Sequence, residues 1–294
     1  MNEFTVGSVT ANGVRFATIE AGDGPLVLCL HGFPDHARSF RHQLPALAAA
    51  GFRAVAPYMR GYAPSEAAAD SRYQSAVLAQ DAVELIGALG YDSAHVFGHD
   101  WGAVAAYGAA IIAPHKVKKL VTAGVPHGPA VLSAFLGDYD QLRRSWYMFF
   151  FQTPFAEAAV PADDFRFIER LWQDWSPGWS YPPEEMEALK ATFRTPGVFQ
   201  AALGYYRCTL NPALQDPALD ELQGMLGMSP VPVPTLFFHG AQDGCMGAYL
   251  TEGMEAFFPA GLHKHIIPGA GHFVHQEKPD EVNRILLDFL KAVS

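Results

Sequence analysis

Two acids and a histidine, each placed just after a short apolar run, could together carry out nucleophilic catalysis. Asp100 comes after "AHVFG", Asp243 after "PTLFFHG" and His272 after "HKHIIPG". A carboxylate is already ionised at neutral pH, so Asp100 needs no base before it attacks, and its natural target is a saturated carbon that bears a leaving group. His272, oriented by Asp243, could then activate a water molecule that hydrolyses the resulting ester. These residues predict a displacement followed by a hydrolysis.

Residues 96–103, "VFGHDWGA", have the form of a nucleophile elbow, the sharp turn between a strand and a helix that presents an attacking side chain. Asp100 stands where the familiar version of this turn has serine. The close chain crossing at such a turn demands small neighbours, and Gly98, Gly102 and Ala103 provide them. Free N–H groups at the start of the following helix favour an anion there. The segment therefore predicts Asp100 as the nucleophile.

The other two residues have simpler explanations when each is taken alone. Asp243-Gly244 is compatible with an ordinary turn, and His272 with a loop histidine bonded to the backbone. His275 is a rival for the role of the base. We favour His272 because the glycines on both sides of Ala270 leave its ring room to reach the site, whereas His275 is expected to start the next helix.

The elements that must position these residues are short apolar strands alternating with helical stretches, which predicts an α/β fold. Asn12-Gly13 is a strong two-residue hairpin signal and suggests an antiparallel start. The runs that follow it are typical of strands buried on both faces of a mostly parallel, doubly wound sheet. They are "PLVLCL", "FRAVAP", "AHVFG", "KKLVTAG", "PTLFFHG" and "HKHIIPG". Parallel strands end at one edge of the sheet, so Asp100, Asp243 and His272 should meet there.

The alternation stops between residues 128 and 225, where aromatic residues are frequent and no comparable strand run occurs. We interpret this segment as an inserted helical cap whose aromatic side chains are mostly its own core. The proline-rich stretch "MSPVPVPT" leads back to the strand "LFFHG". We expect a hydrolase-like core formed by residues 1–127 and 226–294, with the cap at 128–225 between them. His127 is expected at the hinge, with lining the site as the alternative.

Composition and charge exclude several classes of protein. A net charge of −10 argues against nucleic acid or an anionic membrane as the partner, because both need a basic patch. Three scattered cysteines without a CxxC pair predict neither a disulfide framework nor a thiolate metal cluster, and they fit a reducing cytosol. No HExxH-type ligand spacing occurs, so we expect no metal. The chain has no basic and apolar leader and no run of ~18 apolar residues, which predicts a cytoplasmic protein.

Four segments together resemble the α/β-hydrolase superfamily, and specifically its epoxide hydrolase branch. They are "HGFPD", "GHDWGA", "HGAQD" and "GAGHF", in that order. The resemblance covers essentially the whole chain and implies an α/β-hydrolase fold with an inserted helical cap. It implies an oxyanion hole formed by the backbone N–H groups of Phe33 and Trp101. It also implies a cofactor-independent enzyme that converts a small-molecule epoxide and water to a vicinal diol.

Epoxide opening needs a proton donor, because an alkoxide is a poor leaving group unless a hydrogen bond meets it as it forms. In "SWYMFFFQTP" and "LGYYRCT", Tyr147 and Tyr206 resemble the two tyrosines of the epoxide hydrolase family. Tyr205 is a near alternative, since neighbours on a helix point about 100° apart and only one can face the site. Trp101, Phe33 and Trp146 are the expected substrate-binding side chains.

Two other functions stay open. A haloalkane or haloacid dehalogenase would use the same aspartate, and the indole N–H of Trp101 could hold a halide. The phenylalanine at position 33 and the Trp146-Tyr147 pair depart from the dehalogenase patterns. The other alternative is a non-catalytic ligand receptor on the same fold, which would be expected to lack one of the triad residues. The sequence leaves the epoxide, its stereochemistry and the choice between monomer and homodimer open.

Overall fold

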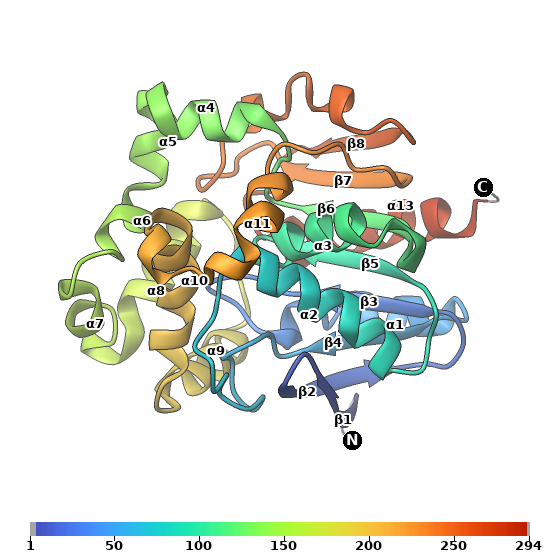
Figure 1. Ribbon diagram of the computed structural model, residues 1–294, viewed down its shortest axis with the longest axis horizontal. Coiled ribbons are helices and arrows are strands. Elements are labelled where there is room, and N and C mark those ends of the chain that lie inside the picture. The colour runs from blue at the N-terminus through green and yellow to red at the C-terminus, as the bar shows by residue number, and fades with distance from the viewer. Residues whose placement is uncertain (1–3, 293–294) are drawn as a thin grey trace.

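The computed structural model describes residues 4–292 and contains one eight-stranded sheet in the order β1-β2-β4-β3-β5-β6-β7-β8 (Figure 1). The first two strands form the hairpin expected at Asn12-Gly13, and both turn residues have positive φ. β2 pairs with β4 in antiparallel fashion, and all later pairs are parallel. The strands are β1 (Thr5–Ala11), β2 (Val14–Ala21), β3 (Leu26–Leu30), β4 (Arg53–Pro57), β5 (Ala94–His99), β6 (Val117–Ala123), β7 (Thr235–Gly240) and β8 (Leu262–Ile267).

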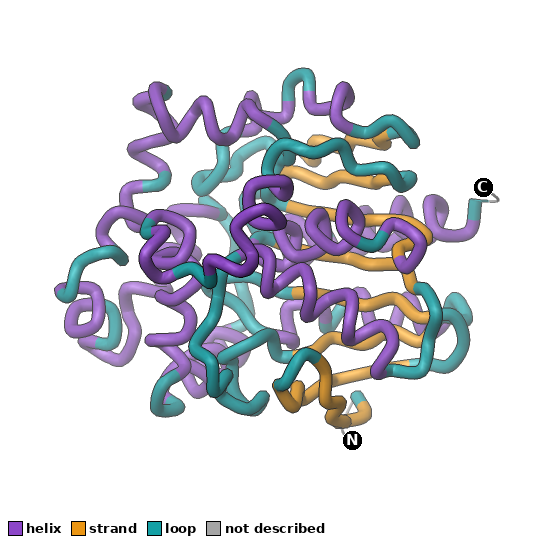
Figure 2. Tube along the Cα trace, in the orientation of Figure 1, coloured by secondary structure: helices purple, strands orange, loops and turns teal. Residues whose placement is uncertain are grey.

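Helices cover both faces of the sheet, as the doubly wound prediction requires (Figure 2). Alternate residues of the central strands enter different cores: Leu28 and Val96 pack with α2 and α3, whereas Val27 and Phe97 pack with α1 and α13. This alternation follows from the two-residue period of a strand. The core helices are α1 (Gln43–Ala49), α2 (Ser75–Ala88), α3 (Trp101–Ile112), α12 (Val274–Glu277) and α13 (Pro279–Lys291), with 3-10 turns η1 (Ala37–Phe40), η2 (Pro114–Lys116), η5 (Ala248–Thr251) and η6 (Met254–Phe257).

The segment between β6 and β7 is helical, and most of it lies beyond one end of the strands in Figure 1. Its elements are α4 (Pro129–Gly137), α5 (Tyr139–Arg144), α6 (Trp146–Phe150), α7 (Phe155–Ala159), α8 (Ala162–Trp175), α9 (Pro183–Arg194), α10 (Val198–Leu210), η3 (Pro212–Leu214), η4 (Pro217–Leu219) and α11 (Asp220–Leu226). We call α6 to α10 the cap helices. α11 packs on α2 and α3 of the core, so the division of the chain at residues 128 and 225 stays a prediction.

Arg60, in the turn after β4, fixes the loops beside the site. Its buried guanidinium donates to both carboxylate oxygens of Asp81 on α2, at 2.7 and 2.8 Å, and to the backbone carbonyl of Asn12 in the hairpin. It thereby joins the turn to α2 and to the β1–β2 hairpin. Among residues 4–292, no helix is both long and apolar enough to cross a bilayer.

Candidate active site

Asp100 stands at the sharp turn between β5 and α3, with φ 53° and ψ −120°. The turn is possible because its neighbours have no side chains: a Cβ on Gly102 would lie 1.9 Å from the carbonyl oxygen of Leu30, and one on Gly98 would lie 2.1 Å from the carbonyl oxygen of Gly102. Such distances are far inside van der Waals contact. The small residues around the predicted elbow therefore have the steric role that the sequence indicated.

One oxygen of Asp100 is seated on backbone from the loop after β3. The N–H of Phe33 donates to Oδ1 of Asp100 at 2.7 Å. A Cβ on Gly32 would lie 2.3 Å from the same oxygen and 2.6 Å from the amide nitrogen of Trp101. Any residue other than glycine would therefore collide with both atoms, which lie on either side of the same small space. An oxygen at this position is therefore already next to the two amides expected to form an oxyanion hole.

The other oxygen of Asp100 faces His272. Nε2 of His272 lies 3.4 Å from Oδ2 of Asp100 and has no hydrogen-bond partner, although the ring is fully buried. The opposite ring nitrogen, Nδ1, is 2.9 Å from Oδ2 of Asp243. The three side chains follow different strands and meet at one edge of the sheet, as expected.

The charges of the two acids dominate the titration of the histidine. Burial lowers the pKa of His272, but the attraction of Asp243 and Asp100 outweighs burial, and the pKa rises to about 10. Burial also raises the pKa of Asp243, and His272 more than offsets that effect and holds it below its usual range. With both acids charged, His272 therefore keeps its proton at neutral pH.

The loop that carries Asp243 is held by its own backbone and by α5. Oδ1 of Asp243 accepts hydrogen bonds from the N–H groups of Cys245 (2.7 Å) and Met246 (2.8 Å). Gln141 of α5 donates to the carbonyl of Cys245 and accepts from the N–H of Gly247. The carboxylate that orients His272 is thus fixed before any ligand binds, because each of these contacts constrains the same short loop.

Tyr147 and Tyr206 approach the site from α6 and α10, and their rings lie 5.6 Å apart. The hydroxyl of Tyr147 is 3.3 Å from the thiol of Cys245, whereas the hydroxyl of Tyr206 is buried without a hydrogen-bond partner. Burial, with the nearby charge of Asp100 as a further contribution, raises the pKa of both phenols well above the usual range. Both side chains therefore stay protonated and can donate a hydrogen bond.

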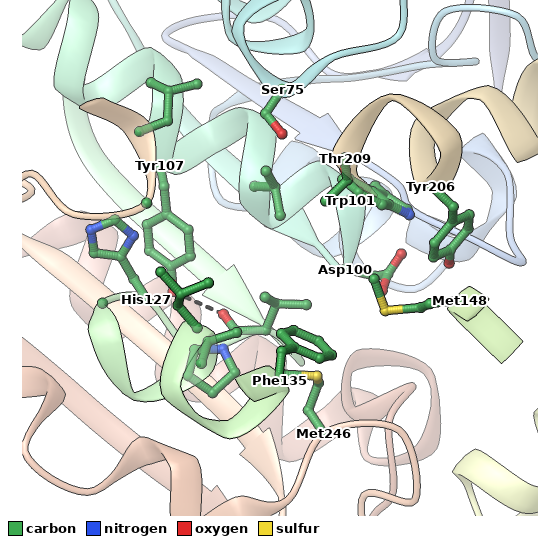
Figure 3. Close-up of a pocket in the computed structure, with 18 of the residues that line it drawn as sticks. Ser75, Asp100, Trp101, Tyr107, His127, Phe135, Met148, Tyr206, Thr209 and Met246 are labelled. Carbon is green, nitrogen blue, oxygen red and sulfur yellow. Dashed lines mark hydrogen bonds between the residues drawn. The ribbon is translucent and has the colours of Figure 1, made fainter. Parts of the chain in front are cut away.

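A cavity of about 410 Å³ reaches Asp100 and runs between α3, α4 and α11 (Figure 3). Tyr147, Tyr206 and Trp101 line it beside Asp100. The rest of the wall is mostly apolar, and it includes Val104, Tyr107, Val131, Phe135, Met148 and Met246. Such a space suits an uncharged organic ligand.

The structure also places three further residues that the sequence analysis considered. The hydroxyl of Tyr205 donates to the carbonyl of Arg60 at 2.7 Å, so Tyr206, and not its neighbour, borders the cavity. His275 is the second residue of α12, which begins at Val274, and it packs against Phe40 without a contact to Asp243. His127 lines the cavity, and its Nε2 lies 2.8 Å from the carbonyl of Ser229, which joins the chain before α4 to the chain after α11.

Trp146 and Phe33 differ from their expected role as substrate contacts. The indole of Trp146 is 47% exposed and packs on Phe150 and Phe167, outside the cavity wall. It lies there because Tyr147, the next residue of α6, points inward. The ring of Phe33 is fully buried among aromatic side chains, and its backbone N–H is the part that meets Asp100. We therefore do not carry Trp146 into the proposal.

Sequence reasoning missed Cys245 and Gln141. Cys245 lies two residues after Asp243, and that proximity was the available signal. One ligand atom each from Asp100, Cys245 and His272 lies within 4.8 Å of the others, a grouping that a soft divalent cation could bridge. In the reaction proposed below, such an ion would occupy both Asp100 and His272. Gln141 had no local signal.

The known proteins that this chain resembles in sequence and in structure include several epoxide hydrolases. Residues 25–279 match the family model described as the alpha/beta hydrolase fold. The chain is 33% identical to epoxide hydrolase 3 of Xenopus tropicalis over 95% of this chain and 76% of that protein, and 31% identical to epoxide hydrolase A of Mycobacterium tuberculosis over 97% of each. The crystal structure of Bacillus megaterium epoxide hydrolase with an inhibitor superposes with a TM-score of 0.85 at 29% identity, covering 97% of this chain and 100% of that one.

Proposed function

The chain belongs to the α/β-hydrolase fold family, in its epoxide hydrolase branch, and from this premise we propose that it hydrolyses apolar epoxides to vicinal diols through a covalent ester on Asp100. The observation that carries the proposal is that the two carboxylate oxygens of Asp100 have different neighbours. Oδ1 rests on the Phe33 amide, Oδ2 faces an unpartnered nitrogen of His272, and the unpartnered hydroxyl of Tyr206 borders the same cavity.

In the first step, Oδ2 of Asp100 attacks a carbon of the epoxide ring, and the bond from that carbon to the ring oxygen breaks. The ring oxygen takes a proton or a strong hydrogen bond from Tyr206, assisted by Tyr147, because a free alkoxide would leave poorly. The product of this step is an ester of Asp100 with the substrate. Oδ1 becomes its carbonyl oxygen and is already beside the Phe33 amide.

Ester formation prepares the second step by removing a charge. The negative charge of Asp100 is one cause of the raised pKa of His272, so the pKa falls when that charge is lost. Once its pKa has fallen, His272 loses the Nε2 proton, which replaces the proton that Tyr206 gave to the ring oxygen. The neutral Nε2 then accepts a proton from the water molecule that attacks Cγ of Asp100. The N–H groups of Phe33 and Trp101 would stabilise the negative charge on Oδ1, and collapse of the intermediate releases the diol and regenerates the carboxylate.

A single turnover in heavy-oxygen water tests the covalent step. Water attacks the ester at Cγ of Asp100, so the first label should enter the side chain of Asp100 and the first diol should carry none. The measurement is peptide mass spectrometry of the segment containing Asp100, with diol analysis in parallel. Label found only in the diol after one turnover would contradict the ester mechanism.

The His272→Gln variant gives a second test of the same scheme. It should form the ester but not hydrolyse it, because the base is missing, so the intact mass should rise by one substrate after mixing with styrene oxide. An unchanged mass would argue against two steps. The Asp100→Ala, His272→Gln double variant is the matched control and should show no increase.

A side-by-side assay decides between this function and its alternatives. Styrene oxide, 1-bromobutane and fluoroacetate are offered to the enzyme, and diol and halide are measured. Diol from styrene oxide supports the proposal. Halide without diol would favour a dehalogenase in which Trp101 holds the ion, and binding without turnover of any of these compounds would favour a receptor.

A further inference from the structure

The cavity beside Asp100 is lined mainly by side chains of α3, α4 and α11. Besides Asp100, its lining includes Val104 and Tyr107 of α3 and Val131 of α4. Its wall also includes Leu132 and Met228, which are 54% and 48% exposed, so the cavity reaches the surface at these residues. Figure 3 shows the same arrangement: Asp100, Trp101 and Tyr206 lie at one side of the view, and Tyr107 and His127 lie at the other. A substituent of a bound epoxide therefore has a path from the reacting carbon to the surface between α4 and α11.

Beside Asp100, outside the cavity lining, lies a group of packed rings that we define as the aromatic wall: Phe33, Phe151, Trp175 and Phe193. The ring of Phe33 lies 5.5 Å from that of Phe151, 6.5 Å from that of Trp175 and 5.9 Å from that of Phe193. Each of the four side chains is at most 2% exposed, and none borders the cavity. A second substituent directed this way would have to displace a packed ring, and close-packed interiors resist such insertion.

The open side of the cavity offers no compensation for a charged group. Among the described residues that line it, Asp100 is the one carboxylate, and neither lysine nor arginine is present. The ring of His127 is bonded to the Ser229 carbonyl, and burial lowers its pKa below the ordinary 6.5, so it is uncharged at neutral pH. A charged substituent would lose its hydration there without gaining a partner.

We infer that the preferred substrates are monosubstituted, terminal epoxides whose single substituent is an uncharged apolar arm, and that epoxides with sizeable groups on both ring carbons are poor substrates. This inference rests on the proposed function. The arm occupies the path between α3, α4 and α11, and the unsubstituted carbon of the ring lies toward the aromatic wall. The shape of the cavity therefore favours substrates in which the epoxide ring is at the end of the carbon chain over substrates in which it is in the middle.

Two isomers of equal composition test the inference: 1,2-epoxyoctane, which has one hexyl arm, and cis-4,5-epoxyoctane, which has two propyl arms. The kcat/KM for diol formation should be at least about tenfold higher for the terminal isomer, because the internal one must push a propyl group into the aromatic wall. Equal values for the two isomers would overturn the inference and leave the proposed function intact. No diol from either isomer or from styrene oxide would overturn the proposed function, and the inference with it.

A pair of variants separates the shape of the cavity from the intrinsic reactivity of terminal epoxides. Phe151→Ala removes a ring that contacts Phe33, Tyr147 and Tyr206, and it should narrow the terminal-to-internal ratio of kcat/KM by at least about threefold. Phe165→Ala is the matched control, because Phe165 is also buried but touches the wall only at Phe193, and its ratio should stay at the wild-type value.

The ratio of kcat/KM for two substrates does not depend on how much of a preparation is folded, so it can be read even from a destabilised variant. If Phe151→Ala yields no soluble enzyme, Phe151→Leu replaces it with the same expected direction. If the terminal-to-internal ratio of kcat/KM were the same in wild type, in the Phe151 variant and in Phe165→Ala, the proposed role of the aromatic wall would be overturned.

A second pair of substrates tests the uncharged arm. The methyl ester of 4-(oxiran-2-yl)benzoate should have a kcat/KM at least about tenfold above that of the free carboxylate at pH 7, because the charged group would lie in the apolar path. Similar values for the ester and the acid would overturn this part of the inference while diol formation still supported the proposed function.

Discussion

The polar side chains at the carboxyl edge of the sheet differ in their hydrogen bonding from those of the cap helices. At the sheet edge, Asp243 accepts two backbone N–H groups and pairs with His272, and Asp100 accepts the N–H of Phe33. In the cap helices, the hydroxyl of Tyr206 is buried without a partner, and that of Tyr147 has only a thiol beside it. At the sheet edge the carboxylates of Asp100 and Asp243 both accept hydrogen bonds, whereas the two cap phenols have no strong acceptor.

The proposed function accounts for this difference by the moment at which each region would act. A buried carboxylate needs compensation at all times, because leaving its charge unpaired costs several kcal/mol. A proton donor for a leaving group must instead stay free until the substrate arrives, so the empty site bears the cost of an unsatisfied hydroxyl, about 1–3 kcal/mol. A buried phenol without a partner is therefore an indication of where the ligand's oxygen binds.

The comparison fails if the sheet edge does not supply the nucleophile. Asp100→Ala should lower the rate of diol formation by about 10⁴-fold or more, because the covalent route is lost. Chromatographic measurement of diol over time checks this, with the exposed Asp92→Ala as a control that should retain wild-type turnover. Substantial turnover by a folded Asp100→Ala enzyme would contradict the assignment.

Removing the two cap phenols should lower the rate less than removing Asp100, but epoxide opening should still depend strongly on them. Replacing both Tyr147 and Tyr206 by Phe should reduce kcat/KM for styrene oxide by about 10²–10⁴-fold, the usual range for losing general acid catalysis. Tyr205→Phe is the matched control, since its hydroxyl is engaged with Arg60, and its activity should change little. Undiminished turnover of the double variant would mean that other groups protonate the oxygen.

A pH series tests the ionic character of the sheet edge. The pKa of His272 is about 10 in the folded protein, against an ordinary value of 6.5, so the stabilisation from its proton is complete below about pH 6.5 and is lost as the pH rises toward 10. The free energy of unfolding of wild type relative to His272→Gln should therefore fall over that range. Urea unfolding at several pH values measures it, and a difference that stays flat or grows would refute the charge assignment.

Stability also distinguishes the two neighbouring tyrosines. Tyr205→Phe should cost about 0.5–1.5 kcal/mol because a buried hydrogen bond to the Arg60 carbonyl is lost, whereas Tyr206→Phe should leave the free energy of unfolding unchanged or raise it. Urea unfolding of both variants gives the comparison. If Tyr206→Phe were the more destabilising, its hydroxyl would have a structural partner and not a reserved one.

The smallest effect is expected at Trp146. Its indole is half exposed on the outer side of α6, so Trp146→Phe should change kcat/KM by less than about twofold, in line with other surface substitutions. Steady-state kinetics with styrene oxide are sufficient. A large rise in KM would show that the indole reaches the substrate and would restore it as a binding residue.

The sequence predicted the positions of side chains best where these follow strand ends. Buried strands are recognisable from continuous apolar runs, and parallel strands must end at a common edge, so Asp100, Asp243 and His272 could be placed together without a structure. Gly98 and Gly102 added a local check, because only a tight chain crossing needs them. The cap offered no such rule, since short helices with many aromatic residues can pack in several rotations.

The amino-acid sequence by itself determined the winding of the sheet, the elbow at Asp100 and the set of acid and base around it, because strand periodicity and backbone sterics act over a few residues. The tertiary structure alone decided that Tyr206 and not Tyr205 borders the cavity, that Trp146 faces outward and that the rings of the aromatic wall are buried outside the cavity lining. These outcomes depend on how helices far apart in the chain rotate and pack against each other, and one residue of helix rotation turns a side chain by about 100°.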